Sequence, residues 1–284
     1  MTEEILIKKT DGSIEPFDVS KLKRSLKRAG VSEEVIRGIV EKVSSELTEG
    51  MTTSQIYKKA YSFLRKKEGR CLVVARYSLK RAVFALGPSG FPFETFVGEI
   101  YRTQGYRVSN GDIVHGKCIE HEVDLLATSE GKTLAAEIKF HNRLGIKTDV
   151  KVALYVHARF EDLVGHRDPE SGVLIDEPML ITNTKFTSNA IKYGECVGMK
   201  MISWDYPREK GNLHGLITEA GLHPITSLPS LSSSERKLLL ENNIVLCRDV
   251  KDKSSSLERL GISPKKIPLL IKDASTLCKP CNEV

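Results

Sequence analysis

The chain lacks any run of about 20 apolar residues, the length that a helix needs to cross a membrane. Its first ten residues, MTEEILIKKT, also lack the apolar core of a signal peptide. Hydrophobic residues make up 40% of the 284 positions and charged residues 28%, a balance that is typical of soluble globular proteins. We therefore expect a cytoplasmic protein of more than one domain with no membrane partner.

Cysteine is also sparse, with six thiols spread over a chain that is too long to need disulfides for stability. Reduced thiols are the expectation. Cys278 and Cys281 form a single CxxC near the end of the sequence. Zinc needs a second such pair and a redox role needs a thioredoxin-like setting, and neither is evident. We expect a frayed terminus there.

Most of the chain has no excess of positive charge. The net charge is +6, but residues 1–90 hold 18 Lys and Arg against 11 Asp and Glu, whereas residues 91–284 hold 25 against 26. The basic excess therefore belongs to the N-terminal third, where phosphate groups are the natural partner. Any DNA contact elsewhere has to come from local patches.

The N-terminal third has the pattern of a hairpin followed by helices. Short strands are expected at residues 5–9 and 13–17, on either side of a glycine-containing turn. Ser32 and Thr53 are the expected N-caps of two of the helices. Helical patterns lie near residues 20–29, 32–48, 53–68 and 70–84. The linker Gly87-Pro88-Ser89-Gly90 predicts a first domain at residues 1–90.

Three segments of this domain, Lys8-Lys9-Thr10-Asp11-Gly12, Gly50-Met51-Thr52-Thr53 and Ala75-Arg76-Tyr77, resemble the ATP-cone family, a small nucleotide-binding regulatory domain. The resemblance covers most of residues 5–86 and implies that ATP or dATP binds here. It implies nucleotide contacts by Lys9, Thr10, Glu15, Lys21 and Thr53.

One position departs from the ATP-cone pattern, because the family usually has arginine where this chain has Thr10. A bidentate phosphate donor is then missing, which leaves nucleotide affinity and preference open. The alternative interpretation is a simple hairpin turn whose lysines are solvated.

Residues 120–141, EHEVDLLATSEGKTLAAEIKFH, have the pattern of two strands joined by a tight turn at residues 129–132. Because side chains alternate along a strand, one face is expected to carry Val123, Leu125, Ile138 and Phe140. The other face is then expected to carry Glu122, Asp124, Glu137 and Lys139. Carboxylates beside a lysine on paired strands suit a divalent metal next to a cation, which is the equipment for phosphodiester hydrolysis.

The elements around this hairpin indicate an α/β/α sandwich with a mixed sheet and helices on both sides. Further strands are expected near residues 106–108, 179–182 and 200–204. Helices are expected near residues 93–104, 148–163 and 188–197. We expect this second domain to span residues 91–227.

Phe93-Glu94 on a helix, Val123-Asp124-Leu125 and Glu137-Ile138-Lys139 stand in the order seen in Mrr-like restriction endonucleases, which this region resembles. The resemblance implies a restriction-endonuclease-like fold in which Asp124, Glu137 and Glu94 bind Mg²⁺ or Mn²⁺. It also implies that Lys139 orients or activates the attacking water.

Several acidic and polar neighbours leave alternatives open. Glu99 is the rival of Glu94 for the helix carboxylate, and Glu122 is either a ligand or part of the rim. His141 and Asn142 fall near the same face and suit contact with phosphate, although a histidine at a strand end is often incidental. Glu-x-Lys is also a common tripeptide on solvated strand faces.

The tail, residues 228–284, is expected to be helical, with a capping box formed by Ser232 and Glu235. Leu260-Gly261-Ile262 predicts a helix stop, and the following Ser263-Pro264 predicts a new N-cap and N1 proline. The stretch resembles helix-hairpin-helix domains, which implies phosphate contact near Lys265 and Lys266. A protein-contact role is the equal alternative.

Together these patterns predict a multidomain α/β protein that acts as a Mg²⁺-dependent DNA endonuclease in DNA defence or repair. The sequence contains no complete Walker motif, Gly-x-x-x-x-Gly-Lys-Ser/Thr, so ATP or dATP is expected as an allosteric ligand. The alternative is a non-catalytic, nucleotide-responsive DNA-binding regulator with a nuclease-like scaffold. A homodimer is expected only from chemistry, because a double-strand break needs two sites.

Overall fold

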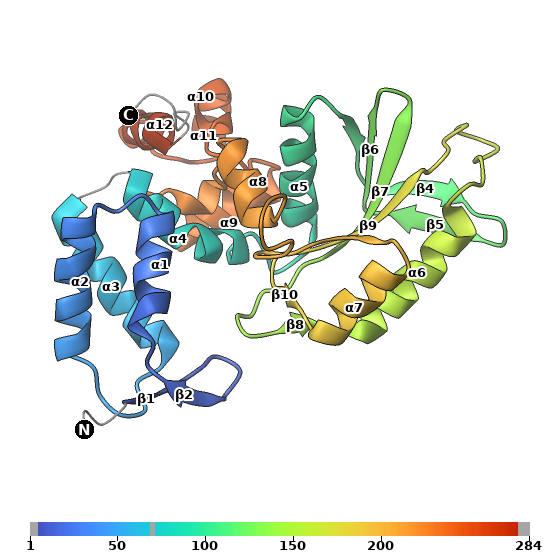
Figure 1. Ribbon diagram of the computed structural model, residues 1–284. Helices are drawn as coiled ribbons and strands as arrows, with labels where there is room; N and C mark the ends of the chain where they lie inside the picture. The colour runs from blue at the N-terminus through green and yellow to red at the C-terminus, as the bar shows by residue number, and fades with distance from the viewer. Residues whose placement is uncertain (1–4, 69–71, 278–284) are drawn as a thin grey trace. The chain divides into compact units, whose positions relative to one another are not determined.

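The computed structural model describes residues 5–68 and 72–277 (Figure 1). The CxxC pair, Cys278 and Cys281, lies outside the described residues. The chain forms two compact units, one of residues 1–82, 225–239 and 247–284 and one of residues 83–224 and 240–246. The domain boundaries expected at residues 90 and 227 stay predictions. Within the described ranges, no helix is both long and apolar enough to span a bilayer.

The first unit begins with an antiparallel hairpin of β1 (Leu6–Lys8) and β2 (Ile14–Pro16), which confirms the expected strands. Four helices follow: α1 (Val19–Arg28), α2 (Glu33–Ser45), α3 (Thr53–Glu68) and α4 (Leu72–Phe84). Their apolar faces meet in one core, in which Leu26, Val43 and Leu64 have no exposed surface. The hairpin-plus-helices expectation is therefore confirmed.

The helix caps are confirmed at one position and corrected at another. Ser32 caps α2, because its side chain accepts a hydrogen bond from Val35 N. Thr53 was the wrong residue for the cap of α3, since it is already the first helical residue. Thr52 takes that role in a reciprocal capping box, in which Gln55 N donates to Thr52 Oγ1 and Thr52 N donates to Gln55 Oε1.

The C-terminal part of the first unit is helical, as expected. It contains the turn η1 (Ile225–Ser227) and the helices α9 (Ser233–Glu241), α10 (Asp249–Asp252), α11 (Ser254–Arg259) and α12 (Ile267–Leu277). The Ser232–Glu235 capping box is confirmed, and Gly261, with φ of +90°, ends α11. The predicted helix N-terminus at Ser263-Pro264 was wrong. A turn, in which Lys266 N donates to Ser263 O, separates Pro264 from the start of α12.

The second unit is built on a mixed sheet of five strands. Their spatial order is β11 (Lys200–Ile202), β9 (Glu177–Thr182), β7 (Lys132–Lys139), β6 (Leu125–Ser129) and β3 (Arg107–Ser109). β7 runs antiparallel to β6 and parallel to β9, which pairs in parallel with β11. The short pair β8 (Lys147–Thr148) and β10 (Lys185–Phe186) and the helix α8 (Leu213–Glu219) complete the unit.

Helices cover both faces of this sheet, as the sequence predicted (Figure 1). On one face lies α5 (Phe91–Thr103), whose Phe93 ring packs 5.4 Å from the Phe140 ring and whose Tyr101 hydroxyl contacts Met179 Sδ at 3.0 Å. On the other face, Leu126 belongs to the core beneath α6 (Val150–Leu163) and α7 (Ser188–Cys196). The result is a mixed α/β architecture with a helical C-terminal region.

The tight turn between β6 and β7 is confirmed. Ser129 pairs with Lys132, and the two loop residues between them, Glu130 and Gly131, both have positive φ, 51° and 77°. These angles define the type I′ geometry that matches the twist of the flanking strands. The turn fixes the register that places Leu125 opposite Ala136.

The expected alternation fails upstream of Leu125. Residues 120–123 form β5, which pairs with β4 (Asp112–His115) in a separate two-stranded ribbon that the sequence did not predict. Asp124 sits at a bend between β5 and β6, so the period of two does not run through it. Val123 consequently packs in the core beneath α6 with Leu126 and does not share a face with Leu125.

Candidate functional site

The structure places Asp124 and Glu137 side by side at the centre of the sheet. The paired register puts Leu125 opposite Ala136, so Asp124 precedes β6 at the level of Glu137. Asp124 Oδ2 accepts a hydrogen bond of 2.6 Å from Ile138 N, the amide next to Glu137. Burial, followed by the charge of Glu137, raises the pKa of Asp124. Two carboxylates are thus held together on rigid strands.

Glu137 is the most enclosed acid of this group, with a relative exposure of 3%. Its carboxylate accepts hydrogen bonds from Lys139 Nζ, from Arg159 and, at 3.0 Å, from the Tyr155 hydroxyl. Burial alone would lower the pKa of Lys139, but the hydrogen bond to Glu137 and the negative charges of Glu137 and Asp124 together outweigh burial and raise that pKa. Lys139 therefore stays a cation at the site, as the sequence predicted.

Glu94, in the first turn of α5, belongs to the same electrostatic group. Burial raises its pKa to about 7, and the negative charges of Asp124, Glu122 and Glu137 add to the effect. Glu99, the rival on the same helix, instead forms an ion pair of 2.6 Å with Arg102. Of the two helix carboxylates, Glu94 is therefore the one whose pKa responds to Asp124 and Glu137, with a further contribution from Glu122 on the ribbon strand β5.

Asn110 joins the helix carboxylate to the strand carboxylate, and the sequence did not single it out. Its Nδ2 donates to the backbone oxygens of Asp124 at 3.0 Å and Glu94 at 3.4 Å. One side chain thereby fixes the spacing between the two backbone segments that carry the acids. The only local signal is its place in the turn sequence Asn110-Gly111, which by itself predicts a turn.

Tyr155 and Arg159 were also missed, although both contact Glu137 from α6. They stand four residues apart on the predicted helix, so the helical period places them on one face. Arg159 Nε also donates to His121 Nδ1 at 3.4 Å, and His121 Nε2 lies 2.8 Å from Asp162 Oδ2. A polar chain therefore runs from Glu137 to the ribbon.

Metal binding at this group remains a prediction. The charges of Asp124 and Glu137 raise the pKa of Glu94, and the charge of Glu137 raises that of Asp124. Carboxylate oxygens are the donors that a hard divalent cation prefers, so this set fits Mg²⁺ in kind. Glu137, however, is already neutralised by Lys139 and Arg159. Across residues 5–68 and 72–277, no three or more His, Cys, Asp and Glu side chains are grouped as a metal site.

The five predicted nucleotide residues of the first unit form two neighbouring contacts. The Glu15 carboxylate forms ion pairs with both lysines, at 2.6 Å from Lys9 Nζ and 2.9 Å from Lys21 Nζ. The hydroxyls of Thr10 and Thr53 lie 3.4 Å apart. Hydrogen bonds from Lys9 and then Lys21 lower the pKa of Glu15. The lysines are thus paired across the hairpin and are not merely solvated, and their contact with nucleotide stays a prediction.

The lysines predicted for phosphate contact in the tail differ from each other. Lys266 forms an ion pair with Glu235 at 2.5 Å, so its ammonium is joined to the residue that also caps α9. Lys265 is exposed. His141 lies just beyond β7, with its ring 3.1 Å from Thr148 Oγ1, and Asn142 is exposed beside it.

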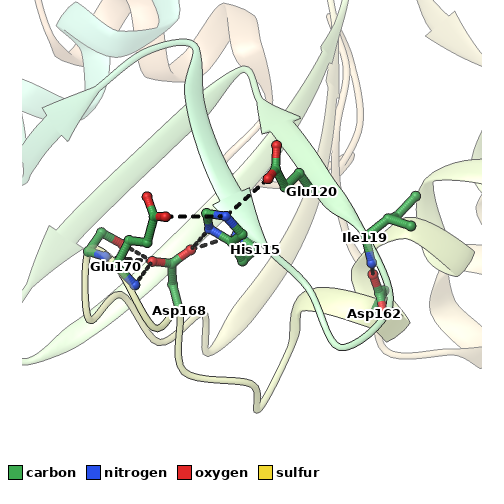
Figure 2. A network of polar contacts seen from close by, with 7 residues as sticks. His115, Ile119, Glu120, Asp162, Asp168 and Glu170 are labelled. Carbon is green, nitrogen blue, oxygen red and sulfur yellow. Dashed lines mark hydrogen bonds and ion pairs between the residues drawn. The ribbon is translucent and has the colours of Figure 1, made fainter.

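A second polar network ties the ribbon to the loop between α6 and β9 (Figure 2). Asp168, with 1% exposure, accepts from His115 N at 2.6 Å on one oxygen and from the Glu170 and Ser171 amides on the other. His115 Nδ1 lies 3.0 Å from Asp168, and its Nε2 lies 3.1 Å from Glu120. Every partner of Asp168 in this network is a donor, so the network is a structural clamp.

We expect Asp168→Asn to lower the free energy of unfolding by about 1–3 kcal/mol, because an amide nitrogen cannot accept the hydrogen bonds that one oxygen now receives. Burial alone would raise the pKa of Asp168, but the hydrogen bonds from His115 and Ser171 hold it well below its usual value. The contribution of ionised Asp168 to stability is therefore present above the ordinary aspartate pKa and is lost as pH falls through the lowered pKa of the folded protein.

Protonated His115 acts in the opposite direction. The hydrogen bond to Asp168 raises the pKa of His115. The contribution of protonated His115 to stability is therefore full below the ordinary histidine pKa and disappears as pH rises through the raised value. Thermal melts of both proteins across pH check this. The difference between wild type and Asp168→Asn should be largest at mildly acidic pH and shrink in strong acid. An equal difference at every pH contradicts the account.

Comparison with known proteins gives two family matches within the chain. Residues 5–83 match the ATP cone domain, and residues 223–278 match the family described as AF1548-like, C-terminal. The fold and these matches define a multidomain α/β protein with a nucleotide-binding ATP cone at its N-terminal end. The resemblance to the ATP-cone family is thereby confirmed, whereas the Mrr-like and helix-hairpin-helix resemblances stay predictions.

Two relatives match this chain over nearly their whole length. An uncharacterized protein of Archaeoglobus fulgidus is 34% identical over 179 residues, which cover 63% of this chain and 97% of that protein. A crystal structure described as a protein of unknown function, AF1548, shares 33% identity with a TM-score of 0.55 and covers 67% of this chain and 98% of its own. The chain belongs to the AF1548-like family.

Proposed function

We propose that this protein is a divalent-cation-dependent DNA endonuclease whose activity responds to ATP or dATP bound at the N-terminal cone. The observation that carries the proposal is the grouping of Asp124, just before β6, with Glu137 and Lys139 of β7, close enough to Glu94 of α5 for the two acids to raise its pKa. The strand directions support it, because antiparallel β3, β6 and β7 followed by parallel β9 form a mixed sheet, as the resemblance to restriction endonucleases implies.

The chemistry assigns a role to each side chain. Phosphodiester hydrolysis requires neutralisation of charge on the phosphorus oxygens and a deprotonated water. Asp124, Glu94 and Glu137 would hold Mg²⁺ or Mn²⁺, which supplies both functions when bound. Lys139 places its ammonium on the same face, where it stabilises negative charge that develops at the phosphate. Asn110 keeps the two acid-bearing segments at a fixed spacing.

The nucleotide would act as a regulator and not as a fuel, since the sequence has no phosphate-binding Walker loop. Its negative phosphates would replace the Glu15 carboxylate as the partner of Lys9 and Lys21. The exposed Lys265 in the helical tail offers an additional contact for DNA phosphates. DNA defence and repair are both compatible with this arrangement, and cleavage of both strands would require a dimer.

A second candidate is a non-catalytic DNA-binding regulator that responds to nucleotide. The contacts of Glu137 with Lys139, Arg159 and Tyr155 favour it, because both oxygens of this carboxylate already accept hydrogen bonds and two cations already neutralise its charge. The two candidates differ in what Arg159 has to do: in the nuclease it moves away from Glu137, and in the regulator it stays.

Supercoiled plasmid separates the two candidates. Full-length protein with Mg²⁺ or Mn²⁺ should convert it to nicked or linear forms, EDTA should stop the reaction, and ATP or dATP should change the rate. DNA retardation without nicking, across methylated, junction-containing and plain substrates, would support the regulator instead.

A further inference from the structure

A buried polar network holds the segment that follows Lys139. Thr182 and Asn183 have no exposed surface, and Thr148 is 1% exposed. Asn183 Oδ1 accepts a hydrogen bond of 2.8 Å from His141 N, and Asn183 Nδ2 donates one of 2.8 Å to His141 O. The backbone of His141 is therefore fixed in both directions, which is more than a solvated strand end requires.

The same network determines which ring nitrogen of His141 carries the proton. The Lys139 carbonyl can only accept, so the Thr182 hydroxyl, 2.8 Å away, must donate its single proton there. Thr148, 3.2 Å from Thr182, then donates its own proton to the Thr182 oxygen. With that proton used, Thr148 Oγ1 can only accept from His141 Nε2 at 3.1 Å. Neutral His141 is thus the Nε2-protonated tautomer, and Nδ1 keeps its lone pair.

That lone pair has no competitor among the described residues, none of which forms a hydrogen bond with Nδ1. Burial, and then the positive charge of Lys139, lowers the pKa of His141 and keeps the ring neutral near neutral pH. Among the carboxylates nearby, Glu137 accepts from three side chains and one oxygen of Asp124 accepts from Ile138 N, whereas Glu94 is assigned to the metal ion in the proposed function. His141 Nδ1 is therefore a basic nitrogen without a hydrogen-bond partner among the described residues, and it lies close enough to Lys139 to be affected by its charge.

We infer that His141 is a further catalytic residue, which accepts a hydrogen bond from the attacking water through Nδ1 and takes its proton. This inference rests on the proposed nuclease function. In the step, the water oxygen forms a bond to phosphorus and the bond from phosphorus to the leaving oxygen breaks. One water proton passes to Nδ1, and the imidazolium returns it to solvent. The leaving oxygen is protonated by solvent. Thr148 and Thr182 are positioning residues that hold the tautomer.

Nitrogen-15 NMR of the imidazoles tests the tautomer without any activity. We expect a protonated Nε2 and an unprotonated Nδ1 for His141 in the wild type. Thr148→Val, which keeps the shape but removes the hydroxyl, should give a mixture of tautomers. A wild-type His141 that carries its proton on Nδ1, or no change in Thr148→Val, overturns the relay.

Plasmid cleavage tests the role of the nitrogen. We expect His141→Ala to lower the rate by about 100-fold, the usual contribution of a general base. His141→Gln should be equally slow, because its amide preserves a donor for Thr148 and lacks the basic nitrogen, and melting temperatures show that both variants fold. His166→Ala, a histidine in the loop after α6, should cleave at the wild-type rate.

The possible failures are distinguishable. Wild-type rates in both folded His141 variants overturn the role of His141 and leave the nuclease proposal standing. A wild-type protein that cleaves nothing overturns the nuclease proposal and the catalytic role together, whereas the NMR result still decides the tautomer.

Discussion

We expect Lys139→Ala to lower the rate of DNA cleavage by about 10³-fold, the loss that follows when one preorganised group for transition-state charge is removed. The ammonium of Lys139 is held on Glu137, which lies on the same strand and face, next to Asp124. No other lysine among the described residues forms a hydrogen bond with Glu137 or Asp124, so none replaces it. Single-turnover cleavage of a labelled duplex measures the effect.

Lys185→Ala is the matched control. Lys185 belongs to the same unit and its ammonium pairs with Asp205 at 2.6 Å, with half of its side chain exposed. Its loss should leave the cleavage rate unchanged. Lys139→Ala removes a partner from a buried acid, so thermal melts must show that the variant is folded at the assay temperature. A folded Lys139→Ala that cleaves as fast as Lys185→Ala contradicts the assignment.

We expect Lys9→Ala to weaken the binding of ATP and dATP by at least about 10-fold, because a charge-assisted hydrogen bond contributes about 1.5–3 kcal/mol. The ATP cone at residues 5–83 supports nucleotide binding, and Lys9 lies at the end of β1, where Glu15 now holds it. Nucleotide phosphates can take the place of that carboxylate. Isothermal titration calorimetry of the full chain gives the dissociation constants.

Lys27→Ala provides the comparison for this prediction. Lys27 lies near the end of α1 and pairs with Glu33 at 3.1 Å, and three quarters of its side chain is exposed. Both substitutions remove one positive charge from the same unit, so only a local contact distinguishes them. Equal dissociation constants for the two variants would remove Lys9 from the nucleotide site, and no heat from the wild type would reject nucleotide binding itself.

The sequence predicted those parts of the fold that short-range chemistry determines. Glu130 and Gly131 make the turn of the β6–β7 hairpin, because a two-residue loop of type I′ needs positive φ at both positions. Asp124, Glu137 and Lys139 follow from that register and from alternation along β7. The predicted N-cap of α3, Thr53, was off by one residue because two neighbouring threonines can both act as caps. The reciprocal hydrogen bonds with Gln55 make Thr52 the cap.

The rest depends on contacts between residues far apart in the chain. The bend at Asp124 and the ribbon of β4 and β5 carry no local signal strong enough to interrupt a strand pattern. Asn110 reaches acids 14 and 16 residues away, and Arg159 reaches Glu137 from another element. Similarly, Thr226 Oγ1 donates to Ala82 O at 2.6 Å, which joins the C-terminal helices to α4 within one unit.

The central claim is that the site around Asp124 and Lys139 hydrolyses a phosphodiester bond with water. Cleavage of a defined duplex in oxygen-18 water, with Mg²⁺ or Mn²⁺, tests it most directly when the product ends are examined by mass spectrometry. We predict one labelled oxygen on the terminal phosphate of the wild-type products and no products from a folded Asp124→Ala/Lys139→Ala protein. Intact duplex with the wild type, or labelled products from the double variant, would contradict the claim.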